Sequence, residues 1–148
     1  TKEAAAGVLG NLQQESSIDP TTLQGGGGIG RGLAQWSTGG RWDTSSPNLL
    51  AFAKQNNLDP WSVDAQTKFM MLEMSNSWGG FDINTFKKMT DVVQATIYFH
   101  DRYEMSADSA DFVRNVRGGY SQSWYNMLKD TRTQTPTSGK LNNYSVSC

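Results

Sequence analysis

Cysteine and histidine are almost absent from this chain of 148 residues, which has one of each, Cys148 and His100. A single cysteine at the end of the sequence excludes an internal disulfide scaffold and a cysteine-rich metal site. A single histidine excludes most zinc sites and leaves His100 as the one candidate base for a serine or cysteine peptidase. The Gly-x-Ser-x-Gly pattern of many serine hydrolases is also missing. We therefore expect no metal and no cofactor, and a serine or cysteine peptidase is poorly supported.

Charge and long apolar runs are sparse as well. The chain has 13 Lys and Arg against 14 Asp and Glu, a formal net charge of −1, and the cations are scattered. Nucleic-acid binding needs a basic patch or stripe, so we expect no nucleic-acid partner. The apolar runs are far shorter than a membrane span, so we expect no membrane insertion. Five Trp and five Tyr among many small polar residues suit an aromatic-lined polysaccharide groove.

The length suits one domain with a hydrophobic core. We place this domain at residues 1–130 and expect a linker-like tail, rich in Thr, Ser and Asn, at 131–148. The sequence shows neither an initiator Met nor a signal peptide. We therefore expect a module of a longer parent protein with further domains.

Periodicity and capping signals predict a mainly α domain with one short, glycine-rich β-hairpin. The first helix is expected from about Thr1 to Ser16, and the hairpin within 21–43. Ser46-Pro47 and Asp59-Pro60 each combine a capping residue with a proline at the expected first helical position. We expect helices from these two starts to about 56 and 75, and further helices over 91–103, 109–117 and 121–130, the last two separated at Gly118-Gly119.

Glu15 is an acid on an apolar helix face, in the same stripe as Val8 and Leu12. Burying an unpaired carboxylate is expensive. One resolution is that the carboxyl group stays protonated, which is the state that a general acid needs. The alternative is an ordinary glutamate at a helix end, either exposed or paired with Arg31 or Arg41.

A turn and a glycine-rich segment follow Glu15. Ser and Asp favour turns and Pro20 disfavours a helical residue before it, so the helix ends here. The glycines at 25–28, 30 and 32 allow the backbone to come close to a ligand. The segment 32–36, Gly-Leu-Ala-Gln-Trp, adds an amide and an indole, which hydrogen-bond to sugars and stack on them.

Glu15-Ser16 followed by 32–35, Gly-Leu-Ala-Gln, resembles the Glu-Ser…Gly-Leu-Met-Gln signature of goose-type lysozymes and lytic transglycosylases. The longer segments 10–16 and 32–36 are similar to the tail-associated lysozymes of phages that infect Gram-positive bacteria. The resemblance covers Ala4 to Trp36. It implies an α+β lysozyme-like fold with the hairpin beside a cleft, and cleavage of the β-1,4 bond between MurNAc and GlcNAc in peptidoglycan glycan strands. It also implies an extracellular or virion-associated protein that acts on the bacterial cell wall.

Carried over to this sequence, the resemblance makes Glu15 the general acid. A late aromatic-plus-Glu segment that lines the cleft in this family corresponds to Tyr103-Glu104. Trp36 and Trp42 either stack on sugars or belong to the core. The expected substrate-binding residues are Ser16, Gly32, Leu33, Gln35, Trp36 and Tyr103.

The second carboxylate is left open by the sequence. Asp43 is a candidate base on the far hairpin strand, Glu104 is another candidate, and Asp19 is close but suited to capping the turn. If none of them faces Glu15, the chain fits a lytic transglycosylase that forms a 1,6-anhydro product with one acid. The sequence is also compatible with an N-acetylglucosaminidase, and with a non-catalytic glycan-binding or tail-structural module.

Overall fold

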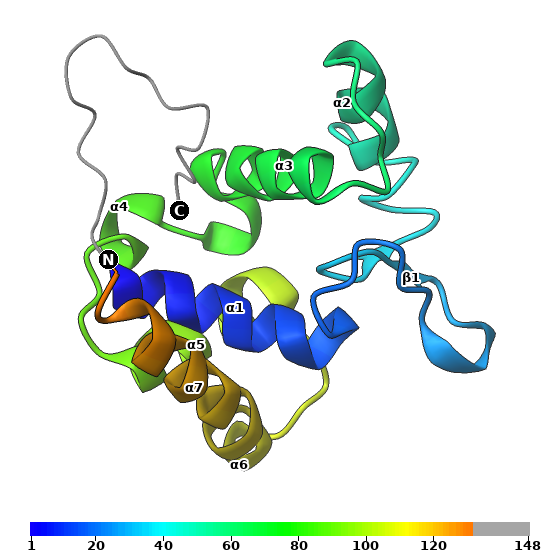
Figure 1. Cartoon of the computed structure of the whole chain (residues 1–148). Coiled ribbons are helices and arrows are strands. Elements are labelled where there is room, and N and C mark those ends of the chain that lie inside the picture. Colours follow the sequence, from blue (N-terminus) through cyan, green and yellow to red (C-terminus); the bar gives the residue numbers. More distant parts are fainter. Residues whose placement is uncertain (132–148) are drawn as a thin grey trace, which may run out of the picture.

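The structure is a computed structural model that describes residues 1–131. Helices dominate it, and one small two-stranded sheet interrupts them (Figure 1). The mainly helical fold with a short antiparallel hairpin, expected from the sequence, is confirmed. The expected tail lies outside the described residues except for Thr131, so the tail and the domain boundary stay predictions. In chain order the elements are α1 (Lys2–Ser16), η1 (Gly25–Gly27), β1 (Gly30–Arg31), β2 (Trp36–Ser37), α2 (Leu49–Gln55), α3 (Val63–Ser75), η2 (Trp78–Gly80), α4 (Ile83–Phe86), α5 (Val92–Phe99), η3 (His100–Glu104), α6 (Ala110–Phe112), η4 (Val113–Arg117) and α7 (Gly118–Leu128).

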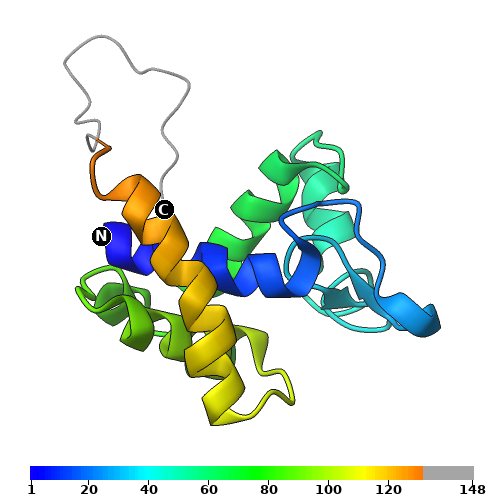
Figure 2. The ribbon, with the colours of Figure 1, turned by 60° about the horizontal axis from the view of Figure 1, so that its bottom comes forward.

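Helix α1 is the central element, and α5 and α7 pack directly on it (Figures 1 and 2). Its start is capped by Thr1, whose hydroxyl accepts a hydrogen bond from the Ala4 amide. Two glycines allow the neighbouring helices to approach closely. A Cβ at Gly7 would lie 2.8 Å from the carbonyl carbon of Ala95 in α5. A Cβ at Gly10 would lie 2.8 Å from the Arg117 carbonyl oxygen at the start of α7. Close packing on α1 therefore depends on these two glycines.

The hairpin lies beyond the C-terminal end of α1 (Figure 1). Strands β1 and β2 are antiparallel, with Gly30 opposite Ser37 and Arg31 opposite Trp36. Left-handed backbone at Gly32, with φ 76°, turns the chain between them. A Cβ there would also lie 2.7 Å from the Gln66 amide oxygen, which accepts a hydrogen bond from the Leu33 amide instead. The turn is thereby fastened to α3.

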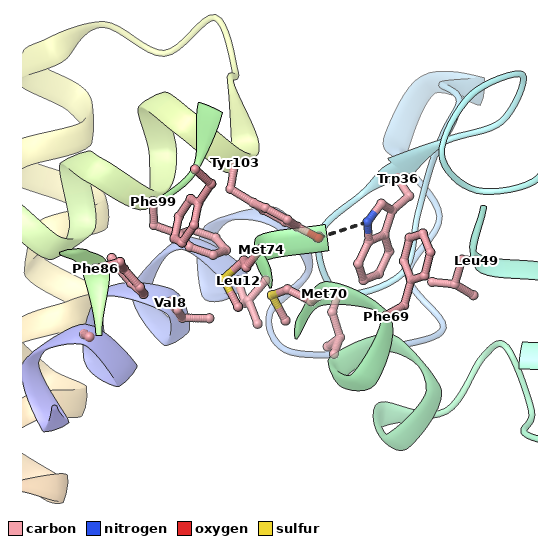
Figure 3. Packing of buried hydrophobic residues seen from close by; sticks show 14 of the residues in the cluster. Val8, Leu12, Trp36, Leu49, Phe69, Met70, Met74, Phe86, Phe99 and Tyr103 are labelled. Carbon is pink, nitrogen blue, oxygen red and sulfur yellow. Dashed lines mark hydrogen bonds between the residues drawn. The ribbon is translucent and has the colours of Figure 1, made fainter. Parts of the chain in front are cut away.

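One hydrophobic core runs from the helical bundle to the space beneath the hairpin (Figure 3). Val8, Phe86 and Phe99 lie at the bundle end, and Leu49 and Phe69 lie at the hairpin end (Figure 3). A hydrogen bond of 3.2 Å from the Trp36 indole to the Tyr103 hydroxyl joins the two sides (Figure 3). The core therefore fixes the hairpin relative to the bundle.

Several expected helix boundaries are wrong. Helix α2 begins at Leu49, because the side chain of Asn48 accepts from the Ala51 amide and takes the cap position. Helix α3 begins at Val63 for the same reason, with Ser62 as its cap. After α5, by contrast, the helical backbone continues through the π-helical turn η3 to Glu104, close to the expected end near Tyr103.

The expected break at Gly118-Gly119 is also absent. Gly118 has φ −62° and ψ −36°, so it continues the helix into α7. Its lack of a side chain is compatible with helical backbone.

Candidate active site

Glu15 lies in the last turn of α1, where two adjacent pockets meet. Each pocket has a volume of about 350 Å³, and both are lined by Glu15, Gln35 and Ser37. We name them by a residue that only one of them contains. The Trp78 pocket is further lined by Ala34, Gly40, Arg41, Ser45, Trp78, Tyr103, Glu104, Met105 and Ser106. The Leu23 pocket is further lined by Thr22, Leu23, Gln24, Gly25 and Gly30.

Arg117 holds Glu15 in place. Its Nη2 donates to Glu15 Oε1 at 2.6 Å and to Asp108 Oδ2 at 2.8 Å, while Nη1 donates to the Asn11 side chain at 3.0 Å. The Arg117 side chain is 2% exposed, and that of Glu15 is 16% exposed. Burial acts to lower the pKa of Arg117, but its hydrogen bonds and the charge of Glu15 outweigh burial, so the pKa is raised. The guanidinium is therefore a permanent charge beside Glu15.

Glu15 is paired with an arginine, as the alternative considered from the sequence had it, but neither Arg31 nor Arg41 is that partner. Arg31 donates to the carbonyl oxygens of Gly28 and Gly30. Arg41 forms an ion pair with Glu73, with Nε 2.6 Å from Oε2. Glu15 is thus mostly buried, as its place on the apolar stripe indicated, but its burial is compensated by a cation from η4.

Glu73 organises the wall of the Trp78 pocket. This carboxylate is 4% exposed and accepts from Arg41 at both oxygens. The Trp36 indole donates to it at 2.9 Å, and the Tyr103 hydroxyl donates at 2.6 Å. Burial, followed by the charge of Glu73, raises the pKa of Tyr103 well above its usual value, so this phenol stays a donor. One carboxylate from α3 therefore joins β2, the segment after it and η3.

Glu104 is the second carboxyl group of the Trp78 pocket. Its Oε1 is buried and has no hydrogen-bond partner within residues 1–131. Burial raises the pKa of Glu104 well above its usual value, and the nearby charge of Glu15 raises it further. Arg117 and Arg41 act in the opposite direction but do not cancel these effects. Glu104 is therefore held towards its neutral form, in which it can donate a proton or a hydrogen bond.

Asp43 and Ser16, by contrast, line neither pocket. Asp43 is exposed and accepts from the Gly39 amide at 2.7 Å and the Thr44 hydroxyl at 2.8 Å, within its own turn. The Ser16 hydroxyl donates to the Leu12 carbonyl of its own helix. The structure does not bring either side chain together with Glu15.

The glycine-rich motif has a mixed outcome. Gln35 lines both pockets and has left-handed backbone, with φ 56°. Its side-chain nitrogen Nε2 donates to the Gly32 carbonyl at 2.8 Å. Leu33 and Trp36 are each 1% exposed and belong to the core, and Trp42 at 4% does too. Trp36 and Trp42 therefore belong to the core and do not stack on sugars. Gly32 and Leu33 act on the site by shaping the turn that carries Gln35.

Residues 1–131 contain no cluster of His, Cys, Asp and Glu that could hold a metal ion. Within the same range, the helices are too short or too polar to cross a membrane.

A family model described as phage tail lysozyme matches residues 1–128. The chain belongs to the phage tail lysozyme family. It is also 30% identical over 138 residues, 86% of its length, to "Morphogenesis protein 1" of Bacillus phage B103. The chain spans 35% of the length of that protein.

Membership of the phage tail lysozyme family supports a peptidoglycan-lytic role and virion-associated action on the cell wall. Three residues that form or support the candidate site were not singled out from the sequence: Glu73, Trp78 and Arg117. Glu73 has a weak signal, since it is an acid on the inner face of α3 next to Met70 and Phe69. Trp78 and Arg117 have none, because their roles depend on contacts across the fold.

Proposed function

We propose that this tail lysozyme cleaves the β-1,4 bond between MurNAc and GlcNAc of peptidoglycan, with Glu15 as the general acid. The observation that carries the proposal is the position of Glu15, which borders both pockets and is fixed by a buried guanidinium. A glycan strand that runs through both pockets would bring a glycosidic oxygen next to Glu15. Gln35, which also borders both pockets, would hydrogen-bond to the sugar beside the cut.

In this mechanism Glu15 protonates the leaving oxygen while the bond to the anomeric carbon breaks. Glu15 becomes a carboxylate in the same step. Arg117, 2.6 Å from Oε1, stabilises that new negative charge without having to reorient. The ion pair therefore favours the transition state, in which charge develops on Glu15.

The choice of second carboxylate decides the product. Glu104 is the one other carboxyl group among the described residues that line the two pockets. Burial and the charge of Glu15 raise the pKa of Glu104 well above its usual value, so Glu104 becomes a carboxylate base less readily than an exposed acid does. This observation favours a second candidate, a lytic transglycosylase, in which a hydroxyl of the substrate attacks and a 1,6-anhydro product forms. Asp43 stays a candidate base only if its turn opens.

Mass spectrometry of the products from purified peptidoglycan tests the proposal. Products with reducible MurNAc ends indicate hydrolysis by a muramidase, and anhydro-MurNAc ends indicate transglycosylation. Reducible GlcNAc ends would move the cut to the other linkage and make the protein an N-acetylglucosaminidase. Absence of any product would refute the proposed cleavage and favour the non-catalytic glycan-binding or tail-structural module.

The substitution Glu15→Gln removes the transferable proton with little change in shape, and we expect it to abolish cleavage. Removal of a general acid costs about 10²- to 10⁴-fold in rate. Glu3→Gln is the matched control, because Glu3 lies on the same helix and lines neither pocket. A Glu15→Gln protein as active as the Glu3→Gln protein would exclude Glu15 as the acid.

A further inference from the structure

The turn between α3 and α4 presents an aromatic ring at the edge of the Trp78 pocket. Three of the seven residues between these helices have left-handed backbone: Ser77 with φ 59°, Gly79 with φ 61° and Gly80 with φ 77°. Such backbone is costly at a residue other than glycine. A Cβ at Gly79 would also overlap the Met105 methyl group and the Arg102 carbonyl oxygen. The turn is therefore tightly fitted to the end of η3, and this fit sets the position of Trp78.

Trp78 is 38% exposed, although it is among the largest apolar side chains and the other pocket-wall aromatic, Tyr103, is 1% exposed. The guanidinium of Arg41 covers one face of the indole, 4.1 Å from the ring centroid. Arg41 is in turn held by two hydrogen bonds to Glu73. The ring is thus held by a charge that is itself fixed by Glu73, and 38% of the Trp78 side chain stays exposed at the pocket.

The surroundings of this ring combine an apolar surface with hydrogen-bonding groups. Met105, 49% exposed, extends the apolar surface along the pocket edge. The other lining side chains include an amide and three hydroxyl groups, from Gln35, Ser37, Ser45 and Ser106. A pyranose ring has the matching character, because its C–H bonds form one apolar face with positive partial charge while its hydroxyl groups point outward. Such a face is attracted to the negative face of an aromatic ring.

We propose that Trp78 is a stacking platform for one N-acetylhexosamine ring of the glycan strand, on the Trp78-pocket side of the bond that is cut. The inference rests on the proposed function, because it takes the ligand to be a peptidoglycan strand. It adds a subsite to that function and assigns the residue that sets its affinity. Trp78 is a binding residue here and takes no part in proton transfer.

Binding measured without cleavage tests this platform. In the Glu15→Gln background, Trp78→Ala is expected to weaken binding to purified soluble glycan strands about tenfold, which corresponds to about 1.4 kcal/mol. Trp78→Tyr keeps an aromatic face and is expected to retain most of the affinity. Leu50→Ala is the control, since Leu50 is 37% exposed, close to Trp78 in exposure, and lines neither pocket.

Steady-state kinetics of Trp78→Ala with Glu15 intact gives a second readout. We expect a raised KM with kcat within a factor of about two, because the ring binds substrate and transition state alike. If Trp78→Ala left both glycan binding and KM unchanged, the inference would be overturned. The proposed function would still stand, provided that the unaltered protein cleaves the glycan. Trp78-dependent binding without any cleavage would uphold the platform and refute the proposed chemistry. Equal losses in Trp78→Ala and Trp78→Tyr, with an unfolding midpoint below that of Leu50→Ala, would show a structural role and also overturn the inference.

Discussion

Replacement of Arg117 by Met is expected to be strongly destabilising. Arg117 is 2% exposed and donates five hydrogen bonds, to Asp108 twice and to Asn11, Glu15 and Ser106. Methionine fills much of the same volume, but it leaves two carboxylates and the fully buried amide of Asn11 without their cation. Removal of one partner of a buried ion pair costs about 3–5 kcal/mol. The side chains of Glu15 and Asp108 are 16% and 28% exposed, so water can partly replace the lost contacts.

The lower end of that range, about 3 kcal/mol, is therefore the expected loss in the free energy of unfolding. For a domain of this size it corresponds to a fall in Tm of roughly 10–15 °C. Urea denaturation followed by circular dichroism measures the first quantity, and a thermal scan measures the second. Arg117→Lys keeps the charge but lacks the planar fork, so we expect it to lie between the unaltered protein and Arg117→Met.

Lys68→Met is the matched control for this experiment. Lys68 and Asp64 form an i,i+4 ion pair whose side chains are 58% and 56% exposed. Loss of such a pair costs about 0.5 kcal/mol or less. If Arg117→Met lost no more stability than Lys68→Met, the assignment of Arg117 as a buried organising charge would be refuted.

Two further changes probe the site and the packing of α1. The pKa of Glu104 is raised in the folded protein, so above about pH 4.3 this carboxyl group ionises more readily in the unfolded chain than in the folded one. The unaltered protein therefore loses stability as the pH rises. Glu104→Gln has no such group and should gain stability relative to the unaltered protein over the same pH range. Urea denaturation at about pH 4 and pH 8 measures this gain, and the same difference in stability at both would contradict it. Gly10→Ala should cost about 1–3 kcal/mol, since the new Cβ would lie 2.7 Å from the Ser121 amide nitrogen and 2.8 Å from the Arg117 carbonyl oxygen. Gly119→Ala is the control, because Gly119 is helical and has open space around it, and it should be neutral or stabilising by up to about 1 kcal/mol. If urea denaturation ranked the two variants in the opposite order, the close packing on α1 would be contradicted.

Local signals in the sequence predicted the parts of the fold that local physics determines. The first helix ends at Ser16 as expected, because the chain enters left-handed backbone at Ser17 and Ile18 directly afterwards. The hairpin follows from glycines that permit the turn at Gly32. The proline-based helix starts failed because a side-chain cap further along the chain, at Asn48 or Ser62, competes successfully with the proline position.

Only Glu15 and the glycine-rich motif around Gln35 were predictable parts of the site. An acid on an apolar stripe identified Glu15 as unusual, and the spacing to Gln35 brought a second pocket residue with it. The compensating cation lies 102 positions away, so the sequence offered nearer arginines and no reason to prefer Arg117. Burial of Trp36 and exposure of Trp78 were likewise undetermined, since both depend on how α3 packs against the hairpin and on the turn after α3.

Two charge networks explain how the pockets keep their shape. On the bundle side, Arg117 ties α1 to η4 and to the loop that carries Asp108. On the hairpin side, Glu73 ties α3 to Trp36, Arg41 and Tyr103. Arg117 and Glu73, at the centres of these networks, are buried, and buried charges are tolerated only with their hydrogen bonds satisfied. Displacement of either wall would break such bonds, so the protein's own contacts hold the geometry around Glu15, and in the proposed reaction the free energy of glycan binding would not be spent on assembling it.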